Sequence, residues 1–186
     1  MLIGLAGAAG CGKDTLADQF VLHDVYEQYR FADPIKAMLA QFHIRPDVWE
    51  DHAQKEKPIP WLGKSPRCMA QTLGTEWGRE MINPDIWVLL AKGRWNVVNA
   101  NSAGGRLVVS DVRFPNEARW IRKAGGILIH VDRPASTHVI DNPGHVTENG
   151  VPAGVCHVQV TNDGTPEDLR KKAWIAVRAY LGMSVE

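Results

Sequence analysis

Gly7-Ala8-Ala9-Gly10-Cys11-Gly12-Lys13-Asp14-Thr15 follows directly on the apolar run Leu2-Ile3-Gly4-Leu5-Ala6 and precedes an amphipathic segment. The stretch matches G-x-x-x-x-G-K in the context of strand, loop and helix that this pattern requires. Its glycines let backbone N–H groups turn inward around a phosphate, and the helix that follows adds the positive end of its dipole. We therefore expect a phosphate loop in which Lys13 reaches the β- and γ-phosphates of a nucleotide. The predicted nucleotide-binding residues of this loop are Gly7, Gly10, Cys11, Gly12, Lys13, Asp14 and Thr15.

The residue after the lysine departs from the commonest form of the motif. Asp14 stands where a Ser or Thr usually contacts Mg²⁺, and the hydroxyl comes one residue later, at Thr15. Nucleoside monophosphate kinases of the adenylate kinase type show a similar displacement, with G-K-G-T. Thr15 is thus a predicted metal ligand, and Asp14 is either part of the nucleotide site or a first-turn acid that favours the helix dipole.

Length, charge and cysteine content exclude several classes of protein. The 186 residues suffice for one sizeable core, which predicts a single α/β domain with an inserted helical region. Lys+Arg and Asp+Glu are both 21, and a formal net charge of zero argues against a nucleic-acid polymer as partner. No apolar run approaches the ~18 residues of a membrane span. Three widely spaced cysteines fit a reducing cytoplasm, that of the host if the protein is phage-encoded.

Short apolar runs alternate with helical patterns along the chain. Beyond the first strand and a helix expected over Thr15 to Tyr29, strands are expected at Tyr29–Asp33, Arg106–Asp111, Gly126–Arg133 and Cys156–Val160. This alternation predicts a five-stranded parallel sheet with helices on both faces, the P-loop kinase architecture. Residues of about 34–100 would form an insertion that binds the acceptor. Residues 135–154, which combine several prolines and glycines with no clear periodicity, would form a lid.

Charged residues follow two of the expected strands. Asp111 ends the apolar run Leu107-Val108-Val109-Ser110, a placement that resembles the Walker B aspartate, which holds Mg²⁺ directly or through water. Arg113 comes immediately afterwards, and Arg133 ends the next strand, so both are expected on the rim that faces the phosphates. A salt bridge between Asp111 and Arg113 is the alternative.

Four polar residues are candidates for binding a phosphate acceptor. Asp33 and Lys36 follow an expected strand end, where ligands bind in open α/β sheets, although helix capping alone would also explain Asp33. Arg67 and Gln71 are four residues apart on an expected helix over Arg67–Glu80 and therefore share one face. An arginine fork suits a phosphate and a glutamine can bind a base edge, whereas exposed polar positions are the alternative.

Several segments of the chain together resemble the phage-type deoxynucleoside monophosphate kinases. The resemblance rests on GLAGAAGCGKDTLAD at 4–18, FADPIK at 31–36, LGTEWGREMINPDIWV at 73–88, VVSDVRFPNEA at 108–118, H-x-T-E at 145–148 and TNDGTPEDL at 161–169. Many NTPases share the glycine loop, whereas the segments beginning LGTEWGRE and ending SDVRFPNEA are much more specific. Residues 45–66 and 135–144 carry no comparable signal, and base choice could reside there.

The resemblance implies transfer of the γ-phosphoryl group of ATP to a deoxynucleoside 5′-monophosphate, with Mg²⁺ as cofactor and a homodimer as the assembly. It implies that Lys13 holds the donor, that Asp111 organises Mg²⁺ and that Arg113 and Arg133 stabilise the transition state. Asn162 would lie where such kinases seat the adenine. The acceptor site would comprise Asp33, Lys36, Arg67, Gln71 and Trp77.

Other functions remain compatible with the same loop. Phosphomevalonate kinase of the animal type and dephospho-coenzyme A kinase are similar in architecture. A nucleotide-dependent switch or assembly ATPase would hydrolyse ATP without an acceptor, and a non-catalytic nucleotide-binding module could dispense with the arginine rim that this chain retains.

Overall fold

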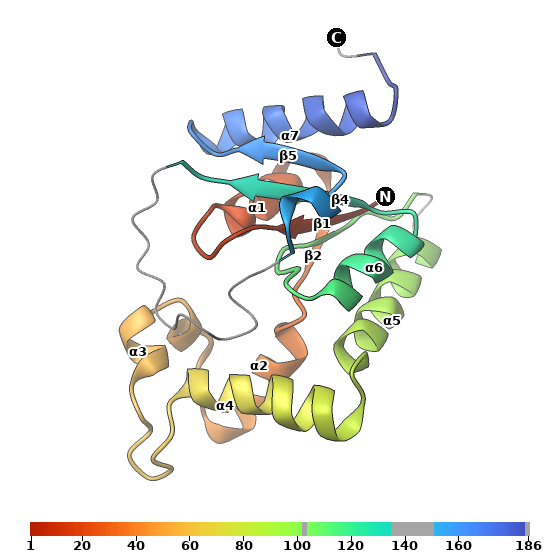
Figure 1. Ribbon diagram of the computed structural model, residues 1–186. Coiled ribbons are helices and arrows are strands. Elements are labelled where there is room, and N and C mark those ends of the chain that lie inside the picture. Colours follow the sequence, from red (N-terminus) through yellow and green to blue (C-terminus); the bar gives the residue numbers. More distant parts are fainter. Residues whose placement is uncertain (102–103, 135–150, 185–186) are drawn as a thin grey trace. The chain divides into compact units, whose positions relative to one another are not determined.

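The computed structural model describes residues 1–101, 104–134 and 151–184 (Figure 1). The chain divides into two compact units. The first comprises Met1–Arg30 and Lys92–Glu186, and the second comprises Phe31–Ala91. The second unit covers similar residues to the insertion expected at about 34–100. The role of this unit in binding the acceptor stays a prediction.

The first unit is built on a parallel sheet of five strands in the order β2-β3-β1-β4-β5. The strand β1 is therefore central, and the glycine loop that follows it lies at the carboxyl edge of the sheet, where open α/β folds bind ligands. This sheet confirms the expected five-stranded parallel architecture. The strands are β1 (Leu2–Ala6), β2 (Glu27–Tyr29), β3 (Leu107–Val109), β4 (Ile127–Asp132) and β5 (Val158–Thr161).

Alternate residues of β1 pack on opposite faces of the sheet. Ile3 and Leu5 belong to a buried cluster with Phe20 of α1 (Lys13–Asp24) and Leu169 of α7 (Pro166–Tyr180). Gly4 faces α6 (Pro115–Lys123) on the other side, where a Cβ would come within 2.4 Å of a methyl group of Ile121. Because strand side chains alternate with a period of two, β1 is covered on both faces, and its sequence is apolar throughout.

The first helix is shorter than the expected Thr15–Tyr29. It ends at Asp24, because Val25 adopts a left-handed conformation with φ 57°, and the chain then enters β2. The strand expected at Tyr29–Asp33 is consequently wrong, since Glu27–Tyr29 pairs with Leu107–Val109. A left-handed residue after a helix is usually glycine, so a β-branched residue there gave no stop signal.

The second unit is helical. Asp33 is the first residue of α2 and Ala32 is its cap, so the prediction that Asp33 caps this helix is wrong by one position. The region from Arg45 to Pro66 contains two short helices, one of which, α3, is capped by the carboxylate of Asp51. The helical elements are α2 (Asp33–Leu39), η1 (Ala40–Phe42), η2 (Pro46–Trp49), α3 (His52–Glu56), α4 (Pro66–Thr72), η3 (Leu73–Ile82) and the first part of α5 (Ile86–Asn101).

The helix expected over Arg67–Glu80 changes character at Leu73, where α4 passes into the ten-residue π-helix η3. The indole Nε1 of Trp87 donates a buried 2.8 Å hydrogen bond to the carbonyl oxygen of Gly74. A Cβ on Gly78 would lie 2.5 Å from Cζ2 of the same indole. Gly78 therefore permits close packing of Trp87, and Gly74 accepts the hydrogen bond of the same indole through its backbone.

Of the expected lid at 135–154, residues 135–150 lie outside the described part of the chain. Val151 is buried, and a short helix, η4 (Ala153–Val155), leads towards β5. Within the described residues, every helix is too short or too polar to cross a membrane.

Candidate active site

The loop between β1 and α1 has the backbone geometry of a phosphate loop. Gly7, Gly10 and Gly12 have φ values of 133°, 70° and 106°, which side chains of L-residues rarely tolerate. A Cβ on Gly7 would lie 2.2 Å from the carbonyl oxygen of Val131, so the loop is pressed closely against β4. The glycines thus provide both the turn and the close approach that the sequence pattern predicts.

Lys13 begins α1, and its side chain is buried beneath the loop. Its Nζ donates to the carbonyl oxygens of Gly7 at 2.9 Å and Ala8 at 2.6 Å and lies 3.7 Å from Sγ of Cys11. Burial lowers the pKa of Lys13, and the charge of Arg113 lowers it further. A phosphate group in the loop would favour the charged ammonium and would offset these effects.

Cys11 takes part in the loop through its backbone. Its side chain is 2% exposed and belongs to the apolar core, so an interaction between the thiol and a ligand is not expected. Its carbonyl oxygen accepts a 2.9 Å hydrogen bond from Nδ2 of Asn162, and the amide N–H of Asn162 donates to the carbonyl oxygen of Asp132 at 2.7 Å. Asn162, expected near the adenine, therefore braces the loop from the end of β5.

Asp14 connects the start of α1 with two strand ends. Its Oδ1 accepts hydrogen bonds from Oγ of Ser110 at 3.0 Å and Nε of Arg30 at 3.3 Å. Oγ of Ser110, which is fully buried, also accepts from Nε2 of Gln28 at 3.1 Å. Side-chain bonds therefore hold this carboxylate in place at the carboxyl edge of the sheet, while the neighbouring Thr15 is exposed.

Arg30, Ser110 and Gln28 were not identified from the sequence as site residues. Ser110 directly precedes Asp111 in the SDVRFP segment, and this adjacency was the one available signal. Gln28 lies on β2 and Arg30 directly follows the last residue of that strand, in a region where the sequence predicted the end of a helix and the start of a strand. Their role became evident only from the pairing of β2 with β3.

Asp111 and Arg113 follow β3 on the same edge. The half-buried Asp111 precedes Val112, whose amide donates to the carbonyl oxygen of Leu5 and so extends the sheet contact. The amide of Arg113 donates to Oε2 of Glu117 at 2.8 Å, and Glu117 is 1% exposed. A buried carboxylate in the first turn of α6 thus fixes the backbone of Arg113 and leaves its guanidinium exposed.

Arg133 immediately follows β4 and is exposed. Within the first unit, hydrogen bonds join Lys13, Cys11, Asn162 and Asp14 to the loop or the adjacent strand ends, and Arg113 is near enough to Lys13 to affect its pKa. Arg133 has the expected position at a strand end, and its action on phosphate stays a prediction.

The five predicted acceptor residues belong to the second unit. Nζ of Lys36 lies 5.6 Å from the centre of the Trp49 ring, and the Nη1 of Arg67 pairs with Oε1 of Glu56 at 2.8 Å. Gln71 lies one turn beyond Arg67 on α4 and is partly buried. From the sequence, Trp49 could either pack the segment at 45–66 or line a base pocket, and its contact with Lys36 was not foreseen. The pairing of Glu56 with Arg67 was not foreseen either, because the packing of α3 beside α4 has no local signature. Asp33 begins α2, and Trp77 lies on η3, 36% exposed.

Comparison with known proteins relates this geometry to a family. The family model described as deoxynucleotide monophosphate kinase matches residues 63–173. A protein of Acanthamoeba polyphaga mimivirus assigned to that activity is 31% identical, over 78% of this chain and 81% of its own. The deoxynucleoside-5′-monophosphate kinase of Escherichia phage T5 is 26% identical, over 82% of this chain and 86% of its own.

Among solved structures, TT1252 from Thermus thermophilus matches with a TM-score of 0.51 and 17% sequence identity, over 97% of each chain, and this likeness concerns the fold alone. The family match covers more than half of the residues, and the mimivirus relative is aligned along most of both chains. The chain therefore belongs to the deoxynucleotide monophosphate kinase family.

Proposed function

We propose that this protein transfers the γ-phosphoryl group of ATP to the 5′-phosphate of a deoxynucleoside monophosphate, yielding ADP and the deoxynucleoside diphosphate. The observation that carries the proposal is the buried ammonium of Lys13 beneath three glycines with positive φ, in a chain of this family. The loop presents N–H groups at a helix start, which is the arrangement that binds phosphate.

The reacting groups explain which side chains the reaction needs. The acceptor phosphate is already an anion and requires little general-base help, so catalysis consists mainly of positioning and of neutralising charge on the transferred group. Lys13 would exchange the neutral carbonyl oxygens of Gly7 and Ala8 for phosphate oxygens, because a charge-assisted hydrogen bond is the stronger one. Arg113 and Arg133 would add positive charge from the ends of β3 and β4, the two strands on either side of β1.

The oxygen donors on this edge fit Mg²⁺. Asp14, Thr15 and Asp111 supply carboxylate and hydroxyl oxygens, which this hard cation prefers. In the described residues no group of three or more His, Cys, Asp or Glu is arranged to hold a metal. Mg²⁺ is usually held by one or two carboxylates together with substrate phosphates, so the proposed ligands would be completed by the phosphates of ATP. Bound Mg²⁺ would neutralise phosphate charge, and Ser110 and Arg30 would keep Asp14 in place.

The second unit would hold the acceptor. Arg67 is the proposed phosphate ligand and Gln71, one turn further along α4, the proposed base contact, with Asp33, Lys36 and Trp77 as further candidates. The ion pair between Arg67 and Glu56 keeps the guanidinium partly buried, with 27% of its side chain exposed. A carboxylate partner of this kind orients an arginine fork for a second anion.

The proposed site of action is the cytoplasm, where both nucleotides are available, and the resemblance to phage enzymes motivates a homodimer. Sedimentation velocity over a range of protein concentrations tests the dimer. A single boundary of monomer mass at every concentration would contradict it.

One assay tests the proposed reaction. Purified protein with ATP and Mg²⁺ is given dAMP, dGMP, dCMP, dTMP, phosphomevalonate or no acceptor, and ADP and the phosphorylated product are separated by chromatography. We expect at least one deoxynucleoside diphosphate to form in step with ADP. ADP release at the same rate without any acceptor would indicate an ATPase, and turnover of phosphomevalonate alone would reassign the acceptor.

A further inference from the structure

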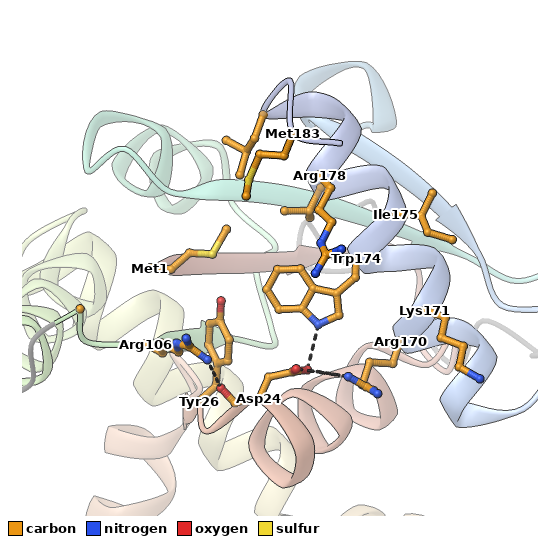
Figure 2. A pocket seen from close by; sticks show the side chains of 13 residues that line it. Met1, Asp24, Tyr26, Arg106, Arg170, Lys171, Trp174, Ile175, Arg178 and Met183 are labelled. Atoms are coloured by element: carbon orange, nitrogen blue, oxygen red, sulfur yellow. Dashed lines mark hydrogen bonds and ion pairs between the residues drawn. The ribbon is translucent and has the colours of Figure 1, made fainter. Parts of the chain in front are cut away.

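A hollow of about 820 Å³ opens on the first unit beside α7 (Figure 2). Met1, which precedes β1, and Arg106, which precedes β3, line it, so it lies at the amino edge of the sheet. The glycine loop follows the carboxyl end of β1, and the five residues of that strand span about 16 Å. The hollow is therefore separate from the proposed active site, and its volume is in the range of small-molecule sites.

The charges around the hollow favour an anion. Arginine and lysine side chains reach it from α7 and from the start of β3, whereas Asp24 is the one carboxylate among the described residues that line it. Asp24 is already neutralised, because Nη1 of Arg170 lies 3.2 Å from Oδ1 and 3.3 Å from Oδ2, and the indole Nε1 of Trp174 donates to Oδ2 at 2.9 Å. Arg106 and Arg178 thus supply positive charge that Asp24 does not offset.

These two arginines retain donors for a ligand. Arg106 donates one hydrogen bond from Nη1 to the backbone carbonyl oxygen of Asp24 at 2.7 Å, which orients its guanidinium and leaves its other N–H groups available. Arg178 is exposed on α7 and makes no side-chain hydrogen bond or ion pair with any described residue. Planar guanidinium groups of this kind match phosphate oxygens two at a time.

A buried hydroxyl group also lacks a partner there. Tyr26 is 3% exposed, and among the described residues its OH has no hydrogen-bond partner. Figure 2 shows this hydroxyl directed into the space between Met1 and Trp174. Burial raises the pKa of Tyr26, so the group remains a proton donor. A buried donor without an acceptor is costly, and an acceptor atom on a ligand would satisfy it.

Apolar and aromatic groups complete the lining. Trp174 packs against the rings of Phe20 and Tyr26, with centroids 5.6 and 6.4 Å away, and is therefore held in one orientation. Ile175 and Met183 line the same hollow, and both are more than half exposed. Fixed aromatic and apolar surface beside unpaired arginines suits a molecule with a planar ring at one end and anionic groups at the other.

We propose that this hollow is a second nucleotide-binding site, which receives the phosphates of a nucleoside phosphate on Arg106 and Arg178 and its base beside Trp174. The hydroxyl of Tyr26 would donate to an acceptor on the base or sugar. The site is independent of the acceptor chosen in the proposed reaction, because none of its residues belongs to the glycine loop or to the second unit.

The test is a calorimetric titration of the full chain whose glycine loop is already saturated with a bisubstrate analogue that joins adenosine to a deoxynucleoside through phosphates. Each of dATP, dGTP, dCTP and dTTP is added, with tripolyphosphate and the unphosphorylated deoxynucleosides as separate probes. We expect one further equivalent of at least one triphosphate to bind, more tightly than either tripolyphosphate or the deoxynucleoside. Arg178→Gln should weaken this binding at least ~10-fold, the scale of a hydrogen bond to a charged group.

Arg119→Gln is the matched control, because Arg119 is an exposed arginine on α6 and does not line the hollow. Arg119→Gln should leave the affinity for the triphosphate unchanged. In a separate measurement, Trp174→Phe should abolish any ligand-induced fluorescence change. The absence of further binding at millimolar triphosphate would overturn the proposal, as would equal losses in both arginine variants or equal affinity for tripolyphosphate. A change of oligomeric state in Arg178→Gln without nucleotide binding would also overturn it, in favour of a second copy of the chain.

A failure of the proposed kinase reaction would be recognised separately. Lys13→Ala should impair the glycine loop and yet still bind one triphosphate that depends on Arg178. If that binding disappears with Lys13, the nucleotide occupies the glycine loop and the second site does not exist. If no deoxynucleoside diphosphate is ever produced, the proposed reaction is wrong. The effect of Arg178→Gln on triphosphate binding would still test the second site.

Discussion

The side-chain amide of Asn162 donates a 2.9 Å hydrogen bond to the carbonyl oxygen of Cys11, 151 residues earlier in the chain. This bond ties the end of β5 to the last turn of the glycine loop before α1. A Cβ on Gly12 would lie 2.2 Å from Nδ2 of the same amide, so the absence of a side chain at residue 12 makes the contact possible. The shape of the loop is therefore maintained from outside the G-x-x-x-x-G-K motif.

Asn162→Ala should loosen the loop and raise the KM for ATP. One neutral hydrogen bond contributes about 1 kcal/mol, which corresponds to roughly a fivefold change if the bond matters only in the nucleotide-binding conformation. Steady-state kinetics with varied ATP at saturating acceptor measures the effect. Asn96→Ala on α5 is the control, because Asn96 is exposed and its side chain makes no hydrogen bond with any described residue. Equal kinetics for the two variants would show that the Asn162 bond is dispensable.

Lys13→Ala should leave the fold intact and lower kcat by at least ~10²-fold, the scale for removing one preorganised donor to developing charge. Among the described residues, the ammonium bonds only neutral loop carbonyls and the Cys11 thiol, so its loss removes little from the core. Circular dichroism checks the fold, and Lys123→Ala on the exposed side of α6 is the matched control. Near-normal turnover of a folded Lys13 variant would refute the assignment of the loop.

Arg67→Ala should raise the KM for the deoxynucleoside monophosphate and leave the affinity for ATP largely unchanged. Glu56→Gln separates binding from structure, because it removes the partner of Arg67 and retains the guanidinium. If Arg67 contacts the acceptor phosphate, Arg67→Ala should be much the more damaging of the two. Similar effects of both variants on stability, with no change in the acceptor KM, would make the pair purely structural. A weaker affinity for ATP alone would reverse the assignment of the two sites.

Sequence patterns predicted those parts of the site that depend on local backbone chemistry. The glycine loop with Lys13, and Asp111 and Arg113 after β3, follow from an apolar strand that ends at a polar residue, and such ends converge on one edge of a parallel sheet. The contacts that brace them were missed. Ser110 and Arg30 were not identified as site residues, and Asn162 was expected near the adenine and not as a support of the loop. Their bonds join different strands and depend on a register that no single segment encodes.

The errors in the fold have a similar origin. Val25 ends α1 in a left-handed conformation that usually requires glycine, and an apolar side chain there extended the helical pattern. The side chain of Val25 is 82% exposed, so its apolar character does not reflect a buried helix face. The π-helical turn at Gly74 and Gly78 was also invisible, because it depends on Trp87, which approaches from a different element.

The stability of the first unit should decrease as the pH falls below about 6.5. Nδ1 of His157 accepts a 2.9 Å hydrogen bond from the amide of Leu128, which requires the neutral ring. Burial, with the charge of Arg122, lowers the pKa of His157, and burial also lowers the pKa of His130. Above pH 6.5, the pKa of an unfolded histidine, these rings are neutral in both the folded and the unfolded protein and do not lower the free energy of unfolding. As the pH falls below 6.5 and through the lower folded pKa, protons bind the unfolded state more strongly, and the free energy of unfolding decreases.

Urea unfolding between pH 5 and pH 8 measures this dependence. His157→Asn should make the free energy of unfolding less dependent on pH, since the side-chain oxygen of asparagine can accept the hydrogen bond from the amide of Leu128 and does not titrate. His23→Asn, at an exposed position on α1, should leave the profile as it is. An unaltered profile in His157→Asn would assign the pH dependence to other groups.

Gly78→Ala should destabilise the protein by about 1–3 kcal/mol, the usual cost of forcing an extra methyl group into a packed site. The new Cβ would lie 2.5 Å from Cζ2 of Trp87 and 3.0 Å from the carbonyl oxygen of Leu73, so either the indole or the π-helix must shift. Gly93→Ala in α5 is the opposite case, because nothing lies within 4 Å of its Cβ position. Gly93→Ala should stabilise the protein by up to about 1 kcal/mol, since alanine favours the helix.

Thermal and urea unfolding compare the stabilities of the two glycine variants. Gly78→Ala combined with Trp87→Phe should destabilise the protein by less than the sum of the single changes. Additive costs, or a neutral Gly78→Ala, would show that the indole does not confine this turn.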